Sequence, residues 1–381
     1  MKNDSLKIRR WRFTEVIVPA RPNAVNHESL NRPLHKLPIA GQGGWTLQFD
    51  ELPKLVVELE LENGAVGLGE FYRGHSWATV EATAHRLLGQ SLRGWPLQKI
   101  PVARCREHDG FELAIWDAYA KSRGLRLCDL LGGALRDEVK VGAWTGHRLP
   151  EEIGPMGAAF AARGYDCWKF KCDLADDVAG WGKSLREFAP GMSMILDPNE
   201  RWDHPHEARR RLRALAEAGN LLCLEDPLPR WMLSEYAALK RLGLAAIVLH
   251  ISLPYVEHGQ RVHDAIRAIQ GDAVDGFNFN GGLAEFRQLA HIAAAAGLPC
   301  WHGSEVDLGI LEAMYVHQAA ATETCIWPSD IFGRLVREHD LLAEPLKISP
   351  PSVQLPTGPG LGVALDRAAL AHYRQREVTI E

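Results

Sequence analysis

From residue 139 to about residue 330, short apolar runs alternate with longer segments in which apolar residues recur at helical spacing. Segments 206–219 and 284–297, rich in Ala and Leu, are examples of the predicted helices. Strands that alternate with helices of about 10–15 residues are typical of βαβ units and a parallel sheet, and about eight such units indicate a barrel. The predicted strands are 139–144, 167–172, 192–197, 221–226, 245–251, 273–279, 298–303 and 325–330.

The first 135 residues have a different pattern, which predicts an antiparallel α+β segment. Its predicted strands are 8–19 and 53–61, followed within 62–70 by a turn and a further short strand, and its predicted helices are 75–93 and 110–124. The stretch 20–45 contains Pro, Gly and Asn without apolar period, so we expect a long loop there. Long loops in compact domains are usually functional.

Composition and charge narrow the possible functions. The 381 residues include 43 Lys and Arg against 48 Asp and Glu, so no basic excess is present to neutralise a phosphate backbone, and we expect no nucleic-acid partner. No apolar run approaches the length of about 18 residues that a membrane span needs. The opening MKNDSLKIRRWRF lacks the apolar core of a signal peptide, so we expect no membrane association and a cytoplasmic location. The seven cysteines have no metal-type spacing, which favours reduced thiols.

Polar residues recur at nearly constant spacing at the ends of the predicted strands. Lys171, Asp197, Glu225 and His250 are separated by 26, 28 and 25 residues, which is about one βα unit each. Because the carboxyl ends of barrel strands form one rim, where active sites of such barrels lie, we expect these side chains to lie close together. Asp197 and Glu225 would supply the hard oxygen ligands that Mg²⁺ prefers.

Lys169 and Lys171 are two residues apart, so on a strand they point to the same face. Two neighbouring ammonium groups lower each other's pKa, and a neutral lysine is a usable base. A divalent ion beside it would stabilise the enediolate that forms when a carboxylate loses its α-proton. The alternative is a Lys–Asp–Glu salt-bridge cluster that fills the barrel.

Seven motifs occur in a characteristic order along the chain. They are NGAVGLGE (63–70), FELAIWDAYAKSRGLRLCDLLGG (111–133), KFK (169–171), LDPNERW (196–202), LEDPLP (224–229), the glycine pair 281–282 and GPGLGVALD (358–366). Together they resemble the enolase superfamily, in its mandelate racemase and muconate lactonizing branch, over nearly the whole chain. The resemblance implies an α/β fold, a modified TIM barrel (β/α)₇β with an α+β capping domain. The implied boundaries are 1–137 for the capping domain, 138–345 for the barrel and 346–381 for a C-terminal segment that returns to the capping domain.

The resemblance also implies roles for the residues at the strand ends. Lys171 would remove the proton, with Lys169 as its electrostatic partner. Asp197 and Glu225 would bind a divalent metal, Mg²⁺ in most of the family, and Asn199 would lie near the substrate.

The active site departs from the family pattern at three strands. On the fifth strand His250 stands where the family has a third carboxylate. An imidazole suits Zn²⁺ or Mn²⁺ better than Mg²⁺. Either the metal is a different one, or it binds weakly, or metal binding has been lost. The sixth strand has no second lysine, because the matching position is Gly276 or Asn280. On the seventh strand His302 would face Lys171 across the substrate if a bulge turned it inward. Asp307 follows, where the lactonizing groups usually have Glu.

The expected function is metal-assisted abstraction of a proton α to a carboxylate by a barrel lysine, in a racemase, cycloisomerase or dehydratase, an isomerase or lyase. The alternative is a homologue that binds a small acid but has weakened or lost metal binding and proton transfer. A Schiff-base lysine aldolase is a third possibility, although it needs no carboxylate pair for a metal. We expect a homo-oligomer. We also expect a small carboxylate substrate, since the predicted loop offers several basic side chains that suit an anion: Arg21, His27, Arg32 and His35.

Overall fold

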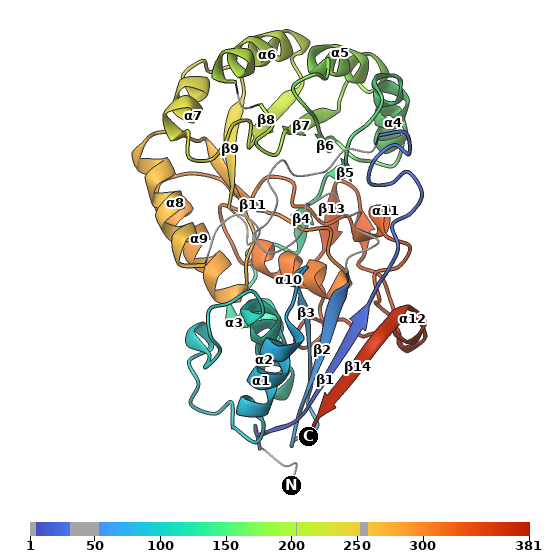
Figure 1. Ribbon diagram of the computed structural model, residues 1–381, viewed down its shortest axis with the longest axis vertical. Helices are drawn as coiled ribbons and strands as arrows, with labels where there is room; N and C mark the ends of the chain where they lie inside the picture. Colours follow the sequence, from blue (N-terminus) through green and yellow to red (C-terminus); the bar gives the residue numbers. More distant parts are fainter. Residues whose placement is uncertain (1–4, 31–52, 203, 252–257) are drawn as a thin grey trace.

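The computed structural model describes residues 5–30, 53–202, 204–251 and 258–381. The loop residues Arg32 and His35 lie outside the described residues. Most of the described chain is an α/β fold in which a parallel sheet curls inside a row of helices (Figure 1).

Seven parallel strands form the curled sheet in chain order, from β5 to β11. The strands are β5 (Ala143–Thr145), β6 (Cys167–Lys171), β7 (Ser193–Asp197), β8 (Leu221–Glu225), β9 (Ala246–Ile251), β10 (Gly276–Phe279) and β11 (Cys300–His302). Helices follow them in turn: α4 (Pro150–Ala162), α5 (Val178–Phe188), α6 (Pro205–Ala218), α7 (Leu233–Lys240), α8 (His258–Gln270), α9 (Leu283–Ala295) and α10 (Gly309–Ala320). The predicted eighth strand makes only single bridges, Cys325 with Cys300 and Ser329 with Val141, so it touches both the last strand and the chain before the first.

A second sheet is antiparallel and contains both ends of the described chain. Its order is β14 (Arg374–Ile380), β1 (Ile8–Val16), β2 (Lys54–Leu61) and β3 (Val66–Phe71), and Figure 1 shows the C-terminal strand beside the first one. Helices α1 (Trp77–Leu87) and α2 (His108–Arg123) cover it. The predicted meander is therefore present, and β14, from the C-terminal segment, adds a fourth strand beside β1. The remaining elements are η2 (Leu97–Lys99), α3 (Leu127–Leu130), β4 (Glu138–Lys140), α11 (Gly333–Val336), β12 (Ile348–Ser349), β13 (Ser352–Gln354) and α12 (Arg367–Tyr373).

Aromatic side chains and one close backbone contact hold α2 against this sheet. Trp11, Phe13 and Phe71 surround Phe111 of α2 with ring centroids 5.2–5.8 Å away. A Cβ atom on Gly67 would lie 2.1 Å from the carbonyl oxygen of Ala114. Glycine at this position of the NGAVGLGE motif is therefore required by the approach of the helix.

Buried carboxylates join the antiparallel sheet and its helices to the parallel-sheet part. Glu70 accepts hydrogen bonds from the backbone N–H groups of Leu308 and Leu311, at the start of α10. Asp109 accepts one from Gly282 N, at the start of α9. Negative groups stabilise the N-terminus of a helix because its first N–H groups have no partner within the helix.

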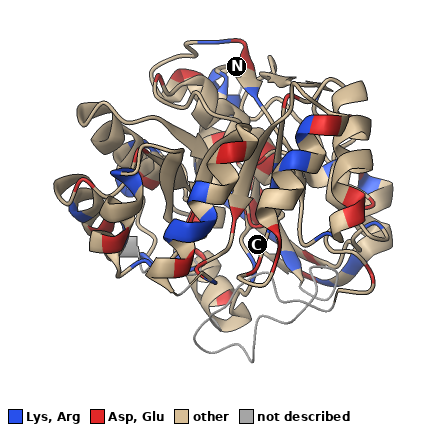
Figure 2. Cartoon of the chain, turned by 90° about the horizontal axis from the view of Figure 1, so that it is seen from above, with Lys and Arg blue, Asp and Glu red and all other residues tan. Residues whose placement is uncertain are grey.

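Acidic and basic residues are interspersed among the helices in the view of Figure 2. In the described part of the chain, no helix is both long enough and apolar enough to span a membrane.

Candidate active site

Strand pairing explains why the regularly spaced polar residues meet. Lys171 of β6 is paired in register with Asp197 of β7, and both lie at the C-terminal ends of their strands. Glu225 ends β8 and lies beside β9, which carries His250. All four side chains are buried, between 0% and 7% exposed, so they form one compact polar site.

A lysine–carboxylate cluster forms the centre of this site; it consists of Lys169, Lys171, Asp197, Glu225 and Asp330. The Nζ atom of Lys169 is 2.7 Å from Glu225 Oε2, 2.9 Å from Asp330 Oδ2 and 3.7 Å from Asp197 Oδ2. Lys171 Nζ donates to the same Asp197 oxygen. These contacts are the ones expected for a Lys–Asp–Glu salt-bridge cluster, the alternative to a metal site in the sequence analysis.

Asp330 was not among the predicted site residues. It ends the segment CIWPSD, which was predicted to be the eighth strand, and its backbone N–H donates to the carbonyl oxygen of His302. The rule applied to the other strands, that a charged residue at a strand's end belongs to the rim, would have found it.

Burial and the neighbouring charges set the protonation of the cluster. Burial alone would raise the pKa of Asp197, but the ammonium groups of Lys171 and Lys169 lower it to about 2. Burial and the Asp197 carboxylate raise the pKa of Glu225 to about 7. Burial alone would lower the pKa of Lys169, but the surrounding carboxylates outweigh this effect and raise the pKa well above its usual range. The shift is therefore opposite in direction to the one expected from a neighbouring lysine. Burial and the Lys169 charge lower the pKa of His250 well below its usual range.

Asparagines complete the polar lining on the sixth strand. Asn278 and Asn280 are two residues apart, with Asn278 in β10 and Asn280 just after it, and both reach the site. Asn278 Nδ2 donates to Glu225 Oε1 at 2.8 Å, and Asn280 Oδ1 is 2.9 Å from His250 Nε2. Asn280 is one of the two positions predicted for this strand, Gly276 being the other, and Asn278 was not predicted.

The residues present do not fit a divalent metal between Asp197, Glu225 and His250. The Lys169 ammonium already lies between the two carboxylates, and both ring nitrogens of His250 have a side-chain oxygen within 3.3 Å. Two groups of described residues do bring three ligand atoms within 4.8 Å of one another, and neither contains a predicted metal ligand. These groups are His108, Asp109 and Glu112, and His147, Asp173 and Asp176.

Asn199 lies beside the cluster in a left-handed backbone conformation, with φ of 47°. Its backbone N–H donates to Asp197 Oδ1 at 2.9 Å. Its buried side-chain amide has no hydrogen-bond partner among the described residues. Because a buried amide without a partner is costly, this group is suited to bind a ligand.

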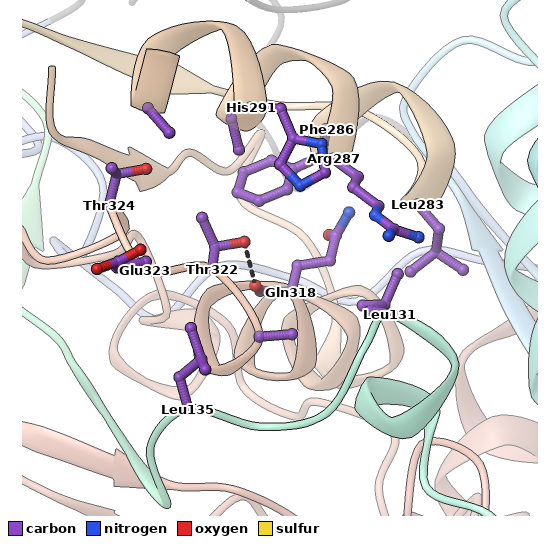
Figure 3. Close-up of a pocket in the computed structure, with 13 residues that line it drawn as sticks. Leu131, Leu135, Leu283, Phe286, Arg287, His291, Gln318, Thr322, Glu323 and Thr324 are labelled. Carbon is purple, nitrogen blue, oxygen red and sulfur yellow. Dashed lines mark hydrogen bonds between the residues drawn. The ribbon is translucent and has the colours of Figure 1, made fainter. Parts of the chain in front are cut away.

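His302 does not reach the cluster. Its ring lies between Phe286 of α9 and Tyr315 of α10, at centroid distances of 4.5 and 3.9 Å. Nε2 is 2.8 Å from Gln318 Oε1, and Nδ1 is 2.7 Å from the carbonyl oxygen of Gly303. Strand β11 pairs with β10 without a shift of register, so the bulge that would turn His302 inward is absent from this pairing. Gln318 and Phe286 also line a cavity of about 220 Å³ between α9 and α10 (Figure 3).

Asp307 also lies elsewhere. It is fully buried, with Oδ1 2.6 Å from Lys54 Nζ and Oδ2 2.6 Å from the Tyr315 hydroxyl. It belongs to the junction between the two sheets and makes no contact with the cluster in the described residues.

The described part of the predicted loop lies against the end of β5. The N–H of Gly146 donates to Val25 O, and the N–H of His147 donates to Asn26 Oδ1. His27 lies in this stretch, with Nδ1 2.7 Å from Ser29 Oγ. Arg21 instead donates to the carbonyl oxygens of Arg334 and Arg337, so it anchors the loop.

A family model for the enolase C-terminal domain-like fold matches residues 156–369, more than half of the chain. The chain belongs to the enolase superfamily. The family model and the curated relatives, muconate cycloisomerases among them, place it in the mandelate racemase and muconate lactonizing branch, with the divergent site described above. It is therefore an enzyme of the isomerase or lyase type.

Relatives from this superfamily differ in their reactions. A chloromuconate cycloisomerase of Cupriavidus pinatubonensis is 28% identical over 348 residues, 84% of this chain and 90% of that protein. A probable glucarate dehydratase of Streptomyces coelicolor is 29% identical over 381 aligned positions, 85% of each chain. The crystal structure of N-succinyl Arg/Lys racemase from Bacillus cereus has a TM-score of 0.79 at 20% identity and covers 98% of this chain and 100% of its own, which shows the fold alone. The cycloisomerases, the epimerase and the probable dehydratase among the curated relatives support proton-abstraction chemistry in general.

Proposed function

We propose that the enzyme moves a proton at the carbon next to the carboxylate of a small acid, with Lys171 as the group that removes it. The observation that carries the proposal is the placement of Lys171 beside Asp197 at the rim, with Asn199 next to both. Racemisation and elimination begin with this step, and cycloisomerisation passes through the same enolate, which a protonated lysine then protonates, so the proposal commits to the proton transfer rather than to one outcome.

The proposed fold is a closed (β/α)₇β barrel with a capping domain. The bridges of Cys325 and Ser329 to both ends of the parallel sheet support closure. The boundaries at 137/138 and 345/346 are proposed from the sequence, and the pairing of β14 with β1 supports the return of the C-terminal segment. The homo-oligomer and the cytoplasmic location stay predictions.

Each residue of the site has a proposed task. Lys171 first loses its ammonium proton to solvent; its neutral Nζ then accepts the α-proton, and the electron pair of the C–H bond passes into the enolate of the substrate carboxylate. Asp197 orients Lys171 through their ion pair. The free amide of Asn199 binds a polar group of the substrate, and the segment that carries His27 covers the mouth beside β5.

A second candidate is a homologue that binds a small acid without transferring a proton. Two features favour this candidate. Lys169 lies between the carboxylates, and His250 stands where the family resemblance implies a third carboxylate. Binding of an acid by calorimetry, with no exchange of its α-hydrogen, would select this candidate.

Hydrogen exchange in D₂O tests the proposed function. Wild-type enzyme is incubated with a panel of hydroxy acids and amino-acid derivatives, and loss of the α-proton signal is followed by NMR. Lys171→Met should reduce exchange by a factor of about 10³ or more, because loss of a positioned base removes its whole contribution. Lys240→Met is the control, since Lys240 pairs with Asp272 at the surface. Exchange that survives Lys171→Met at the control's rate would contradict the role of Lys171.

A further inference from the structure

We infer that the Lys169 ammonium is the permanent cation of this site, occupying among the carboxylates the place that a divalent ion would take. The inference deepens the proposed function and rests on it for its catalytic meaning, but its binding test does not depend on activity. It concerns a difference between this chain and the metal site that the family resemblance implies.

The first observation is the convergence of three acidic side chains on one nitrogen. Glu225, Asp330 and Asp197 approach Lys169 Nζ at 2.7, 2.9 and 3.7 Å, from three different segments. One N–H of the ammonium donates a hydrogen bond to Asp330 Oδ2, Glu225 Oε2 lies at ion-pair distance, and Asp197 Oδ2 at 3.7 Å contributes charge rather than a hydrogen bond. The ammonium is also 5.5 Å from the centre of the Trp301 ring, a further favourable contact for a cation.

The second observation is that the oxygens of the two expected metal ligands already face N–H donors. Asp197 Oδ1 accepts from the Asn199 backbone, and its Oδ2 faces both lysines. Glu225 Oε1 accepts from Asn278, and its Oε2 faces Lys169. Mg²⁺ takes about six oxygen ligands in near-octahedral geometry, so these contacts would have to break before it could bind.

The third observation is the balance of charge. Lys169 and Lys171 oppose three carboxylates, which leaves a formal charge of −1 in a site that is at most 8% exposed. A divalent ion added to this set would change the charge to +1, an imbalance of the same size, so the ion would neutralise nothing in the wild-type site. Removal of Lys169 alone would instead leave a charge of −2, which a divalent ion would neutralise.

Substitution of Lys169 should therefore create a metal site. Wild-type protein, freed of metal by EDTA and dialysis, is titrated with Mn²⁺ and followed by electron paramagnetic resonance and thermal unfolding. We expect wild type to bind with a Kd above about 1 mM, and Lys169→Met to bind at least about tenfold more tightly and to regain Tm as Mn²⁺ is added. Lys121→Met is the matched control, because Lys121 pairs with the buried Asp117 outside the cluster, and it should gain no affinity for Mn²⁺.

Asp197→Asn shows whether a bound Mn²⁺ ion lies in the lysine–carboxylate cluster or at another site. Mn²⁺ binding that survives this substitution belongs to another site, such as the group His147, Asp173 and Asp176, and leaves the inference standing. Wild-type binding with a Kd below about 100 μM that Asp197→Asn abolishes would overturn the inference, even if Lys169→Met does not fold.

The D₂O assay separates this inference from the proposed function. Exchange by metal-free wild type supports both. No exchange and no Mn²⁺ binding by wild type support the inference and refute the proposed function. Exchange that requires Mn²⁺ bound through Asp197 refutes the inference alone.

Discussion

Lys54 lies at the junction of the two sheets, and its replacement by Met is expected to destabilise the protein strongly. Its Nζ atom is 3.0 Å from Glu70 Oε1 and 2.6 Å from Asp307 Oδ1, and the side chain is 1% exposed. Glu70 in turn holds the start of α10 through two backbone N–H groups. Lys54→Met would leave two buried carboxylates facing each other without a cation.

The expected loss is about 3–5 kcal/mol of unfolding free energy near pH 8, the usual effect of removing one partner from a buried ion pair. It should shrink as the pH falls. Burial already raises the pKa of Glu70, and Lys54 opposes this rise. Without Lys54 the folded protein holds a carboxyl whose pKa lies further above its unfolded value. Such a group costs little below the unfolded pKa, and its cost grows as the pH rises through the folded pKa.

Urea unfolding at about pH 5, 6.5 and 8 of wild type, Lys54→Met, Asp307→Asn and the double variant measures the effect and the coupling. The double variant should recover at least about 1 kcal/mol relative to the sum of the single losses, because one of the two stranded charges is gone. Lys140→Met, at an exposed position, should stay within about 0.5 kcal/mol of wild type. A loss below about 1 kcal/mol at pH 8, or an equal loss at pH 5, would refute this reasoning.

Three further outcomes are expected. Gly67→Ala should lose at least about 2 kcal/mol of unfolding free energy, since its Cβ would lie 2.1 Å from the carbonyl oxygen of Ala114. The control Gly191→Ala, whose Cβ would have nothing within 4 Å, should change the unfolding free energy by less than about 1 kcal/mol, and equal effects would contradict the close approach of α2. Burial raises the pKa of Glu312 to about 8, above its unfolded value, so this group costs wild type stability as the pH rises towards 8. Thermal melts of Glu312→Gln should show a smaller loss over this range, and an unchanged slope would rule the explanation out. Burial lowers the pKa of His302 to about 4, so the ring is neutral near pH 7. His302→Phe should lose about 1–3 kcal/mol of unfolding free energy, because Gln318 Oε1 and the Gly303 carbonyl would lose their partner, yet D₂O exchange should stay within about threefold of wild type. A much larger fall in exchange would restore a catalytic role for His302.

The lysine and carboxylate positions could be predicted because they follow local rules. Side chains alternate along a strand, and strand ends recur once per βα unit, so Lys169, Lys171, Asp197 and Glu225 were assigned to one rim before any contact was known. The structure places them together through the in-register pairing of β6 with β7 and the order of the sheet.

Side-chain direction on the last strands depended on the tertiary structure. Trp301 faces Lys169, and because neighbouring residues on a strand point to opposite faces, His302 lies against α9 and α10. The sequence could equally place a bulge there, and only the pairing of β10 with β11 decides between the two directions.

The sequence by itself determined the order of the elements, the family and the charged residues of the rim, because periodicity and motif order are properties of the chain. Only the tertiary structure decided which charge each group faces. Asp307 meets Lys54 of the other sheet, 253 residues away, and Lys169 meets Asp330, 161 residues away. These distant pairings determine whether a carboxylate is free to bind a metal or is already neutralised by a lysine, and no local pattern contains them.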